Sequence, residues 1–473
     1  MTDDVTAENT FVPEPMTRRR VARLAAPVVA EYSLQVMVLA VNTFLVSQAG
    51  DIALAGVGVA NPVLYILIAV FGAISIGSTV LVAQAHGAGE RNLANRLARQ
   101  AIGWGLLLAI PLAILCYALT PTLVGLFGDD REVQDAAISY LRVIVATSPV
   151  MLTSFLCGGV LRGAGDGRTP LIAAVLANVA NLFASWLLIE GNLGVPGYGI
   201  TGAAWGATIG RAVGLTFLLF ALFGGWAVIS LRGRDGWLPE VGTGKELFRL
   251  GIPAAIEQIA NEGGFAVLTM LVATLGAAAL AANHIAFTIL EIWYLTSLAL
   301  SVTATALAGQ SVGAKRPEDG LVAALMLRRW TLIWNVVGLL VMVLGARPIL
   351  SIFSDDPEVI DGGIVVMVVV GLTLPLFGLW LLTTGALRGS GDTRTPMVRG
   401  VLATWLTVLL AWIGVTFLDG GMGHIWGAYL LTLPFAIVGN WRAFRRRVTP
   451  GEERGERKEE TETRKEGQGV RVA

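Results

Sequence analysis

Two glutamates lie in the middle of long apolar segments, where an acidic side chain has little water around it. Glu262 falls about 12 residues into the segment 250–274, and Glu291 falls about 11 residues into the segment 280–311. At about 1.5 Å per residue of helix, both are expected near the middle of a hydrocarbon layer roughly 30 Å thick. A carboxylate at that depth must be protonated, paired or open to a wet cavity. We therefore predict that the two residues bind a proton or a cation; the alternative is a protonated glutamate that joins two helices.

Two further glutamates occupy equivalent places in their segments. Glu31 and Glu257 each lie about seven residues into an apolar run. Both are predicted either to line the site or to pair with an arginine as a brace. Gln35 and Asn42 follow Glu31 by four and eleven residues, which places the three on one face of a helix. This polar stripe is expected to line either a cavity or a contact between helices.

A second polar stripe and one tryptophan complete the candidate residues. Asn178, Asn181 and Ser185 carry no charge, so they are predicted to orient a bound molecule or to pack helices. Trp380 is expected near mid-membrane, where its ring either stacks on an aromatic cation or anchors the helix in lipid.

The elements that must hold these residues are membrane-spanning helices. Of the 473 residues, 55% are hydrophobic and only 14% are charged, and the mean hydropathy is +0.69. Apolar runs of about 20 residues recur, which is the length that crosses a bilayer as a helix. We predict an all-α membrane protein with twelve transmembrane helices, near residues 24–48, 54–85, 100–120, 134–160, 170–190, 201–230, 250–274, 280–311, 322–345, 359–386, 397–417 and 425–443.

The chain repeats itself at a constant offset of 226 residues. The segment Leu161-Arg-Gly-Ala-Gly-Asp-Gly-Arg-Thr-Pro170 returns as Leu387-Arg-Gly-Ser-Gly-Asp-Thr-Arg-Thr-Pro396. Because each repeat has six helices, both halves insert in the same direction, which predicts two six-helix lobes related by a pseudo-two-fold axis along the membrane normal. Such duplication is typical of secondary transporters, whose site lies between the repeats.

The repeat divides the chain into five regions. Residues 18–232 form an N-lobe and residues 249–448 form a C-lobe. The linker 233–248 is rich in glycine and is expected to let the lobes rock against one another. Residues 1–17 are predicted to be an N-terminal tail, and residues 449–473 a disordered tail without apolar side chains to bury.

Basic residues gather on one side of the predicted bilayer. The N-terminal segment and alternate loops carry most of the arginines, whereas the opposite loops carry Asp129, Asp130, Asp355 and Asp356. By the positive-inside rule, both termini are cytoplasmic in a multi-pass protein of the plasma membrane. The net charge is zero, so no nucleic-acid partner is expected. The predicted partners of this monomer are the lipid bilayer and small molecules.

Three arginines in or beside apolar segments are expected to pair with acids. Arg162 can reach Asp166 across the repeated turn, while Arg142 and Arg211 can pair with an acid such as Glu190. The turn itself is interpreted as mainly structural, with gating as the alternative, because its glycines end one helix and its proline begins the next.

Several motifs together resemble the multidrug and toxic compound extrusion (MATE) family, in its NorM-like or DinF-like forms. They are the duplicated turns, Ala-Ala-Asn-His-Ile-Ala at 281–286 and Ala-Leu-Ala-Gly-Gln-Ser-Val-Gly-Ala at 306–314. The resemblance implies two six-helix lobes and the antiport of organic, usually cationic compounds against a cation. The DinF-like branch carries aspartates where this chain has Asn42 and Ser185. The NorM-like pattern of glutamates in helices seven and eight is matched by Glu257, Glu262 and Glu291.

The predicted function is multidrug efflux, in which H⁺ or Na⁺ and an organic cation compete for one acidic cavity while the two lobes alternate access. Glu262 and Glu291 would suit Na⁺ as well as a proton, and no cofactor is expected. The alternative is a flippase or exporter of a lipid-linked or polysaccharide precursor, which would require a cationic cavity. An enzyme is not predicted, because the short loops carry no nucleophile with its base and no metal cluster.

Overall fold

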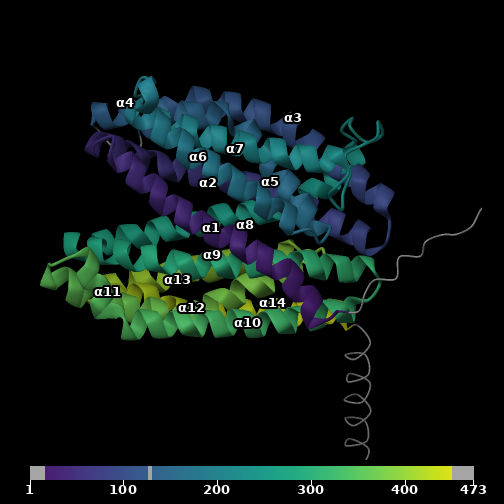
Figure 1. Cartoon of the computed structure of the whole chain (residues 1–473). Helices are drawn as coiled ribbons and strands as arrows, with labels where there is room; N and C mark the ends of the chain where they lie inside the picture. The colour runs from purple at the N-terminus through teal and green to yellow at the C-terminus, as the bar shows by residue number, and fades with distance from the viewer. Residues whose placement is uncertain (1–15, 126–129, 450–473) are drawn as a thin grey trace, which may run out of the picture.

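The computed structural model of the protein describes residues 16–125 and 130–449 (Figure 1). Regular structure in these ranges is helical. Most of the two predicted tails, and Asp129, lie outside the described residues. The elements are α1 (Arg18–Ser47), α2 (Asp51–Gly87), α3 (Arg91–Val124), α4 (Arg131–Ala146), α5 (Ser148–Gly163), α6 (Arg168–Glu190), the short 3₁₀ helix η1 (Asn192–Gly194), α7 (Gly199–Gly224), α8 (Val241–Ala273), α9 (Ala277–Gly313), α10 (Pro317–Leu344), α11 (Ala346–Phe353), α12 (Pro357–Gly389), α13 (Arg394–Phe417) and α14 (Met422–Val448).

The helices account for the twelve predicted spans. Ten of those described are long and apolar enough to cross a bilayer, and α4 with α5 makes an eleventh. The twelfth is α8, a helix of 33 residues whose polar residues Glu257, Asn261 and Glu262 lower its hydropathy. The fourth span was expected as one helix over 134–160 but is broken at Thr147, with a bend of 51°. The break precedes Pro149, which has no N–H to donate and whose ring crowds the preceding turn.

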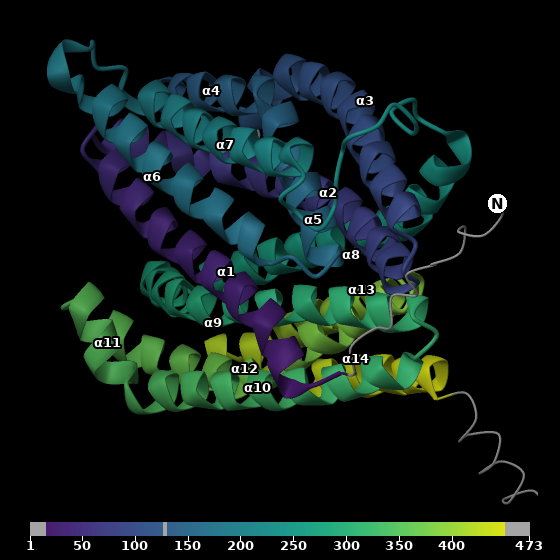
Figure 2. The same ribbon diagram turned by 45° about the vertical axis from the view of Figure 1, so that its right-hand side comes forward.

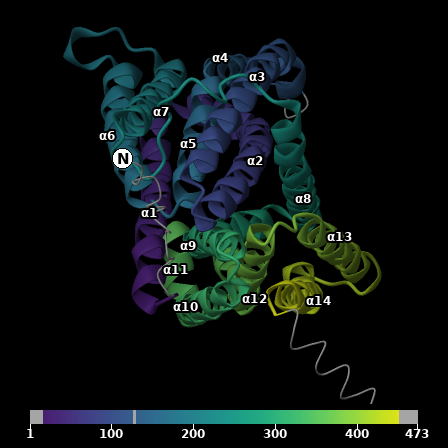
Figure 3. The ribbon, with the colours of Figure 1, turned by 90° about the vertical axis from the view of Figure 1, so that its right-hand side faces the viewer.

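The helices form two lobes, each with its own apolar core. Helices α2–α7 form one layer and α9–α14 the other (Figures 1 and 2). Viewed along the bundle in Figure 3, α1 on the left and α8 on the right run from one layer towards the other. The first helix of each lobe therefore lies where the two lobes meet.

Both of these first helices pack on the two lobes at once. The start of α1 packs against the C-lobe, where Leu24 and Val28 share a cluster with Leu307 of α9 and Phe444 of α14. The start of α8 packs against the N-lobe, where the ring of Phe248 lies 5.7 Å from that of Trp104 in α3. The later parts of the two helices pack within their own lobes, α1 on α6 and α8 on α13.

The repeated turns are built alike, although not as expected. Asp166 does not pair with Arg162; it accepts the backbone N–H groups of Arg168 and Thr169 at 3.1 and 3.0 Å and the Thr169 hydroxyl at 2.6 Å. It thereby caps the start of α6, whose N–H groups have no partner within the helix. Asp392 accepts the Thr395 hydroxyl at 2.8 Å in the same way.

The lobes are joined at the end of the bundle where α1 begins and α14 ends, which we call the terminal face (Figure 2). Gln310 of α9 donates to the carbonyl of Gly163 in the N-lobe at 2.8 Å. Its repeat equivalent, Gln84 of α2, donates to the carbonyl of Gly389 in the C-lobe at 3.4 Å. The two glutamines therefore bind the repeated turn of the opposite lobe.

Two glycines allow α2 and α9 to touch at the terminal face. A Cβ atom on Gly87 would overlap the backbone of Gln310, and a Cβ atom on Gly313 would overlap the backbone of Gln84. Only hydrogen atoms fit in these places, so the closed contact depends on glycine at both.

The linker between the lobes, expected to let them rock against one another, is hydrogen-bonded to the N-lobe. Gln100 of α3 donates to the carbonyls of Gly236 at 2.9 Å and Leu238 at 2.6 Å. Arg99 donates to the carbonyl of Asp235 at 2.6 Å. Since α8 begins directly after this clamped segment, relative motion of the lobes must be taken up by the contacts of α1 and α8.

Candidate functional site

The two glutamates predicted to lie near mid-membrane are on the helices that pack against the N-lobe. Glu262 of α8 and Glu291 of α9 are both half-buried. Tyr65, on α2 of the N-lobe, lies within electrostatic range of both carboxyl groups. Both helices pack against α2, which places the two acids of the C-lobe on the side of the lobe that faces Tyr65.

A short polar chain leads from Glu262 into the protein. Gln258, one helical turn earlier on α8, donates to the Glu262 carboxyl at 3.1 Å. The phenol of Tyr294 on α9 is hydrogen-bonded with Gln258 and lies within electrostatic range of Glu262, of Arg388 on α12 and of Tyr32 on α1. These contacts extend the site along the seam between α1, α8 and α9.

Neither acid has a basic partner among the residues that the structure describes. Gln258, a neutral amide, is the side chain that contacts Glu262, and Glu291 has no polar contact there. An uncompensated carboxylate in the span is costly, so the site favours a bound proton, metal cation or organic cation. Side chains that are half-buried rather than sealed can exchange these occupants with water.

Glu31 and Glu257 take the other predicted role, as partners of arginine. Arg162 of α5 contacts Glu31 at 2.9 Å, and Arg388 of α12 contacts Glu257 at 2.7 Å. Both pairs are buried, and they occupy equivalent places in the two lobes. Each glutamate therefore already balances a fixed positive charge and braces the first helix of its lobe.

Replacing Glu257 by glutamine is expected to destabilise the protein by about 3–5 kcal/mol, because Arg388 would remain buried without its counter-charge. Thermal unfolding of the purified protein measures the loss. Glu262→Gln is the matched control, because it removes no ion pair and should leave the unfolding temperature nearly unchanged. Equal losses from both variants would show that the pair between Glu257 and Arg388 is not a brace.

The polar stripe on α1 that follows Glu31 has one exposed member and one that is partly buried. Gln35 is exposed and Asn42 is half-buried. The side-chain oxygen of Asn42 is itself buried, without a hydrogen-bond partner in the described ranges. Asn42 therefore remains a candidate for contact with an occupant, whereas Gln35 lies away from the buried part of the stripe.

The stripe on α6 serves helix packing. Ser185 donates to Asn181 at 3.0 Å, and both are buried where Gly206 and Gly210 of α7 come close. Asn178, one turn earlier, is half-buried. The close approach of small residues and the internal hydrogen bond are typical of tightly packed membrane helices.

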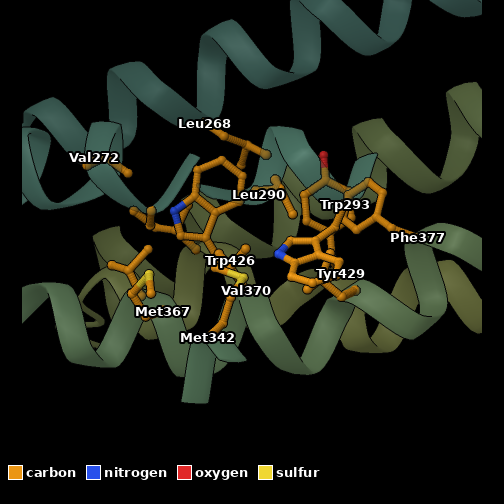
Figure 4. Close-up of a cluster of buried hydrophobic side chains, with 14 of the residues drawn as sticks. Leu268, Val272, Leu290, Trp293, Met342, Met367, Val370, Phe377, Trp426 and Tyr429 are labelled. Atoms are coloured by element: carbon orange, nitrogen blue, oxygen red, sulfur yellow. The ribbon is translucent and has the colours of Figure 1, made fainter. Parts of the chain in front are cut away.

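Trp380 belongs to an aromatic cluster within the C-lobe. The cluster packs Trp293, Phe377 and Tyr429 against the apolar side chains shown in Figure 4. The ring of Phe377 lies 6.0 Å from that of Trp380 and 4.9 Å from that of Tyr429. The Trp380 indole N–H and the Tyr429 hydroxyl are buried without a partner in the described part of the chain. These polar atoms suit a bound aromatic molecule or buried water better than a lipid anchor.

A separate hollow of about 500 Å³ lies between α12 and α14, near the opposite end from the terminal face. Val365, Val369, Met422 and His424 are among its lining residues. It contains none of the predicted site residues, and its apolar lining offers no charge for a cation.

Sequence reasoning identified the acids but missed the neutral groups around them. Tyr65, Gln258 and Tyr294 were not predicted. The spacing of four residues between Gln258 and Glu262 is a detectable signal, since such residues are neighbours on a helix. Tyr65 and Tyr294 could not be found in this way, because only the packing of α2 and α9 brings them to the site.

The chain matches known proteins over nearly its whole length. The MatE family model matches residues 27–187 and again 253–413, two blocks that reproduce the 226-residue offset. A probable multidrug resistance protein NorM of Thermotoga maritima is 29% identical over 443 residues, which are 90% of this chain and 94% of that protein.

Solved structures show the same fold. The structure of MATE in complex with MaL6 superposes with a TM-score of 0.85 at 22% identity, over 92% of this chain and 97% of that one. An outward-facing multidrug resistance MATE transporter of the MOP superfamily gives a TM-score of 0.84 at 21% identity, over 92% and 96% of the two chains. With two matched blocks that cover more than half of its length, the chain belongs to the MatE family of transporters.

Proposed function

We propose that the transporter exports amphipathic organic cations in exchange for H⁺ or Na⁺, and that Glu262 and Glu291 form the shared site. The observation that carries the proposal is the pair of half-buried, mid-span carboxyl groups at the lobe boundary, without a basic partner in the described chain. A lipid-linked diphosphate, the cargo of the alternative function, would be repelled by these acids.

Competition for the acids supplies the coupling. An ionised carboxylate can balance the charge of an organic cation or of Na⁺, while a proton removes that charge altogether. Tyr65 and Tyr294 present aromatic faces beside the acids, which suit the apolar part of an amphipathic cation. Binding of one occupant therefore weakens binding of the other, as antiport requires.

Alternating access would proceed by making and breaking the contacts at the terminal face. The tail of α14 places Arg445, Arg446 and Arg447 at this face, so we assign it to the cytoplasm by the positive-inside rule. With Gln84 and Gln310 closed across it, the state described is closed to the cytoplasm. Protonation or cation binding would then favour one arrangement of the lobes 18–232 and 249–448 over the other.

Inside-out vesicles that contain the protein test this proposal. The fluorescent cation rhodamine 123 is added outside, and the pH and Na⁺ gradients are imposed separately. We expect uphill dye accumulation driven by one of the two gradients, and none in vesicles without the protein. Dye movement that follows neither gradient would exclude cation-coupled antiport.

A further inference from the structure

We propose that Arg211 forms an anion-binding subsite inside the N-lobe, which takes a carboxylate group of transported molecules. The inference deepens the proposed function, on which it rests. It implies that the substrates include zwitterions, with a cationic part held by the acids of the C-lobe and a carboxylate held by the N-lobe.

Arg211 occupies the middle of a membrane span and faces the lobe interior. It is the thirteenth residue of α7, which has 26 residues. Thr208 and Leu218, three residues before it and seven after it, are buried, whereas Val213 and Phe220 on another face are exposed. The helical repeat therefore directs Arg211 inward.

No carboxylate balances Arg211 in the described chain. The group that acts on it electrostatically is the phenol of Tyr140 on α4. Arg162 and Arg388 are each joined to a glutamate, Arg99 donates to backbone carbonyls, and Arg399 has a buried nitrogen without a partner in the described ranges. A guanidinium cannot lose its charge in a protein, so a span that retains one without a counter-ion marks a functional site.

The expected pairing with Glu190 is absent, since that residue contacts Asn192 at 3.4 Å. Arg142, the other arginine for which this pairing was expected, is exposed and lies over the ring of Tyr117 at 5.4 Å. Arg211 thus differs from Arg142 in lying inside the lobe rather than on its exposed surface.

Two elements that flank Arg211, α7 itself and the break between α4 and α5, carry hydroxyl groups. The Thr147 hydroxyl, at the break between α4 and α5, contacts the Thr208 hydroxyl of α7 at 3.0 Å. The neighbouring Ser148 is fully buried, and its hydroxyl has no partner among the described residues. Arg211 and Tyr140 each keep part of their surface accessible. A guanidinium with nearby hydroxyl donors is the arrangement that binds carboxylates.

Two dyes that differ in a single group provide the test. Rhodamine 110 carries a free carboxylate, and rhodamine 123 is its methyl ester. Their affinities are measured with the purified full-length protein by fluorescence polarisation, for the wild type and for Arg211→Gln. We expect the substitution to weaken rhodamine 110 binding about tenfold or more and to leave rhodamine 123 binding unchanged, because only the first dye offers a charge-assisted hydrogen bond.

Two further variants give the controls. Arg142→Gln removes an exposed guanidinium from the same lobe and should change neither affinity. Arg211→Lys keeps the positive charge and should retain more rhodamine 110 binding than Arg211→Gln. An equal change for both dyes in Arg211→Gln, or no change for either, would overturn the subsite.

The wild type alone also separates the two proposals. A protein that binds rhodamine 123 but not rhodamine 110 would refute the anion subsite and leave the proposed cation antiport intact. A protein that binds rhodamine 110 through Arg211 but transports rhodamine 123 with neither gradient would refute the antiport alone.

Discussion

Replacing Glu262 by glutamine should abolish coupled efflux while the protein remains folded and inserted. Glutamine keeps the size and hydrogen-bonding capacity of a protonated glutamate, including the contact with Gln258, but it cannot release a proton or balance a cation. The variant is therefore fixed in a state that mimics protonation. Loss of a charge-assisted contact should weaken dye binding about tenfold or more at pH 8.5, because such contacts contribute roughly 1.5–3 kcal/mol.

The dependence of dye affinity on pH should also differ between the wild type and Glu262→Gln. In the wild type, affinity for rhodamine 123 should increase from pH 6 to pH 8.5 as the carboxyl groups ionise, whereas Glu262→Gln should show a much smaller slope. Glu246→Gln changes an exposed acid of the same helix and should behave as the wild type. If Glu262→Gln keeps the wild-type slope and pumps normally, Glu291 or Glu257 must take its role.

Adding one methyl group at Gly87 should hold the terminal face open. A Cβ atom there would overlap the backbone of Gln310, which cannot move aside as a flexible side chain can. Overpacking costs about 1–3 kcal/mol, which corresponds to a shift of roughly five- to 160-fold in the balance between closed and open states. The transport rate should fall as the closed state becomes less populated, since the cycle must pass through that state.

Distances between spin labels on α2 and α9 at the terminal face measure this shift. Gly87→Ala should lengthen the distances, and Gly58→Ala, in the same helix but with no atoms within 4 Å of the added Cβ, should leave them unchanged. Unaltered distances and full activity in Gly87→Ala would show that the contact between α2 and α9 does not form during transport.

Much of the fold can be predicted from the sequence because each of the patterns that determine it involves many residues. The 226-residue offset, the long apolar runs and the uneven arginine distribution each act over whole segments. Local partners were less predictable. Arg162 binds Glu31, which lies 131 residues away, rather than Asp166. Asp166 accepts the backbone N–H groups at the start of α6, and the tertiary fold brings the Glu31 side chain within reach of Arg162.

The site was predictable only in its charged members. Glu262 and Glu291 stand out because any acid in an apolar run is exceptional. Tyr65 enters the site from the other lobe, and its position depends on how α2 packs against α8 and α9. The attachment of the linker to the N-lobe could not be predicted either. Its hydrogen bonds with Gln100 join segments far apart in the sequence, and no pattern in the sequence relates them.

The exchange of cations at Glu262 and Glu291 is tested most directly by what binding releases. Rhodamine 123 is titrated into the purified transporter in a weakly buffered solution, once with a pH indicator and once with a Na⁺-selective electrode. We expect wild-type protein to release H⁺ or Na⁺ in proportion to bound dye, and the double variant Glu262→Gln with Glu291→Gln to release neither. Saturable dye binding to the wild type without release of either ion would contradict the shared site.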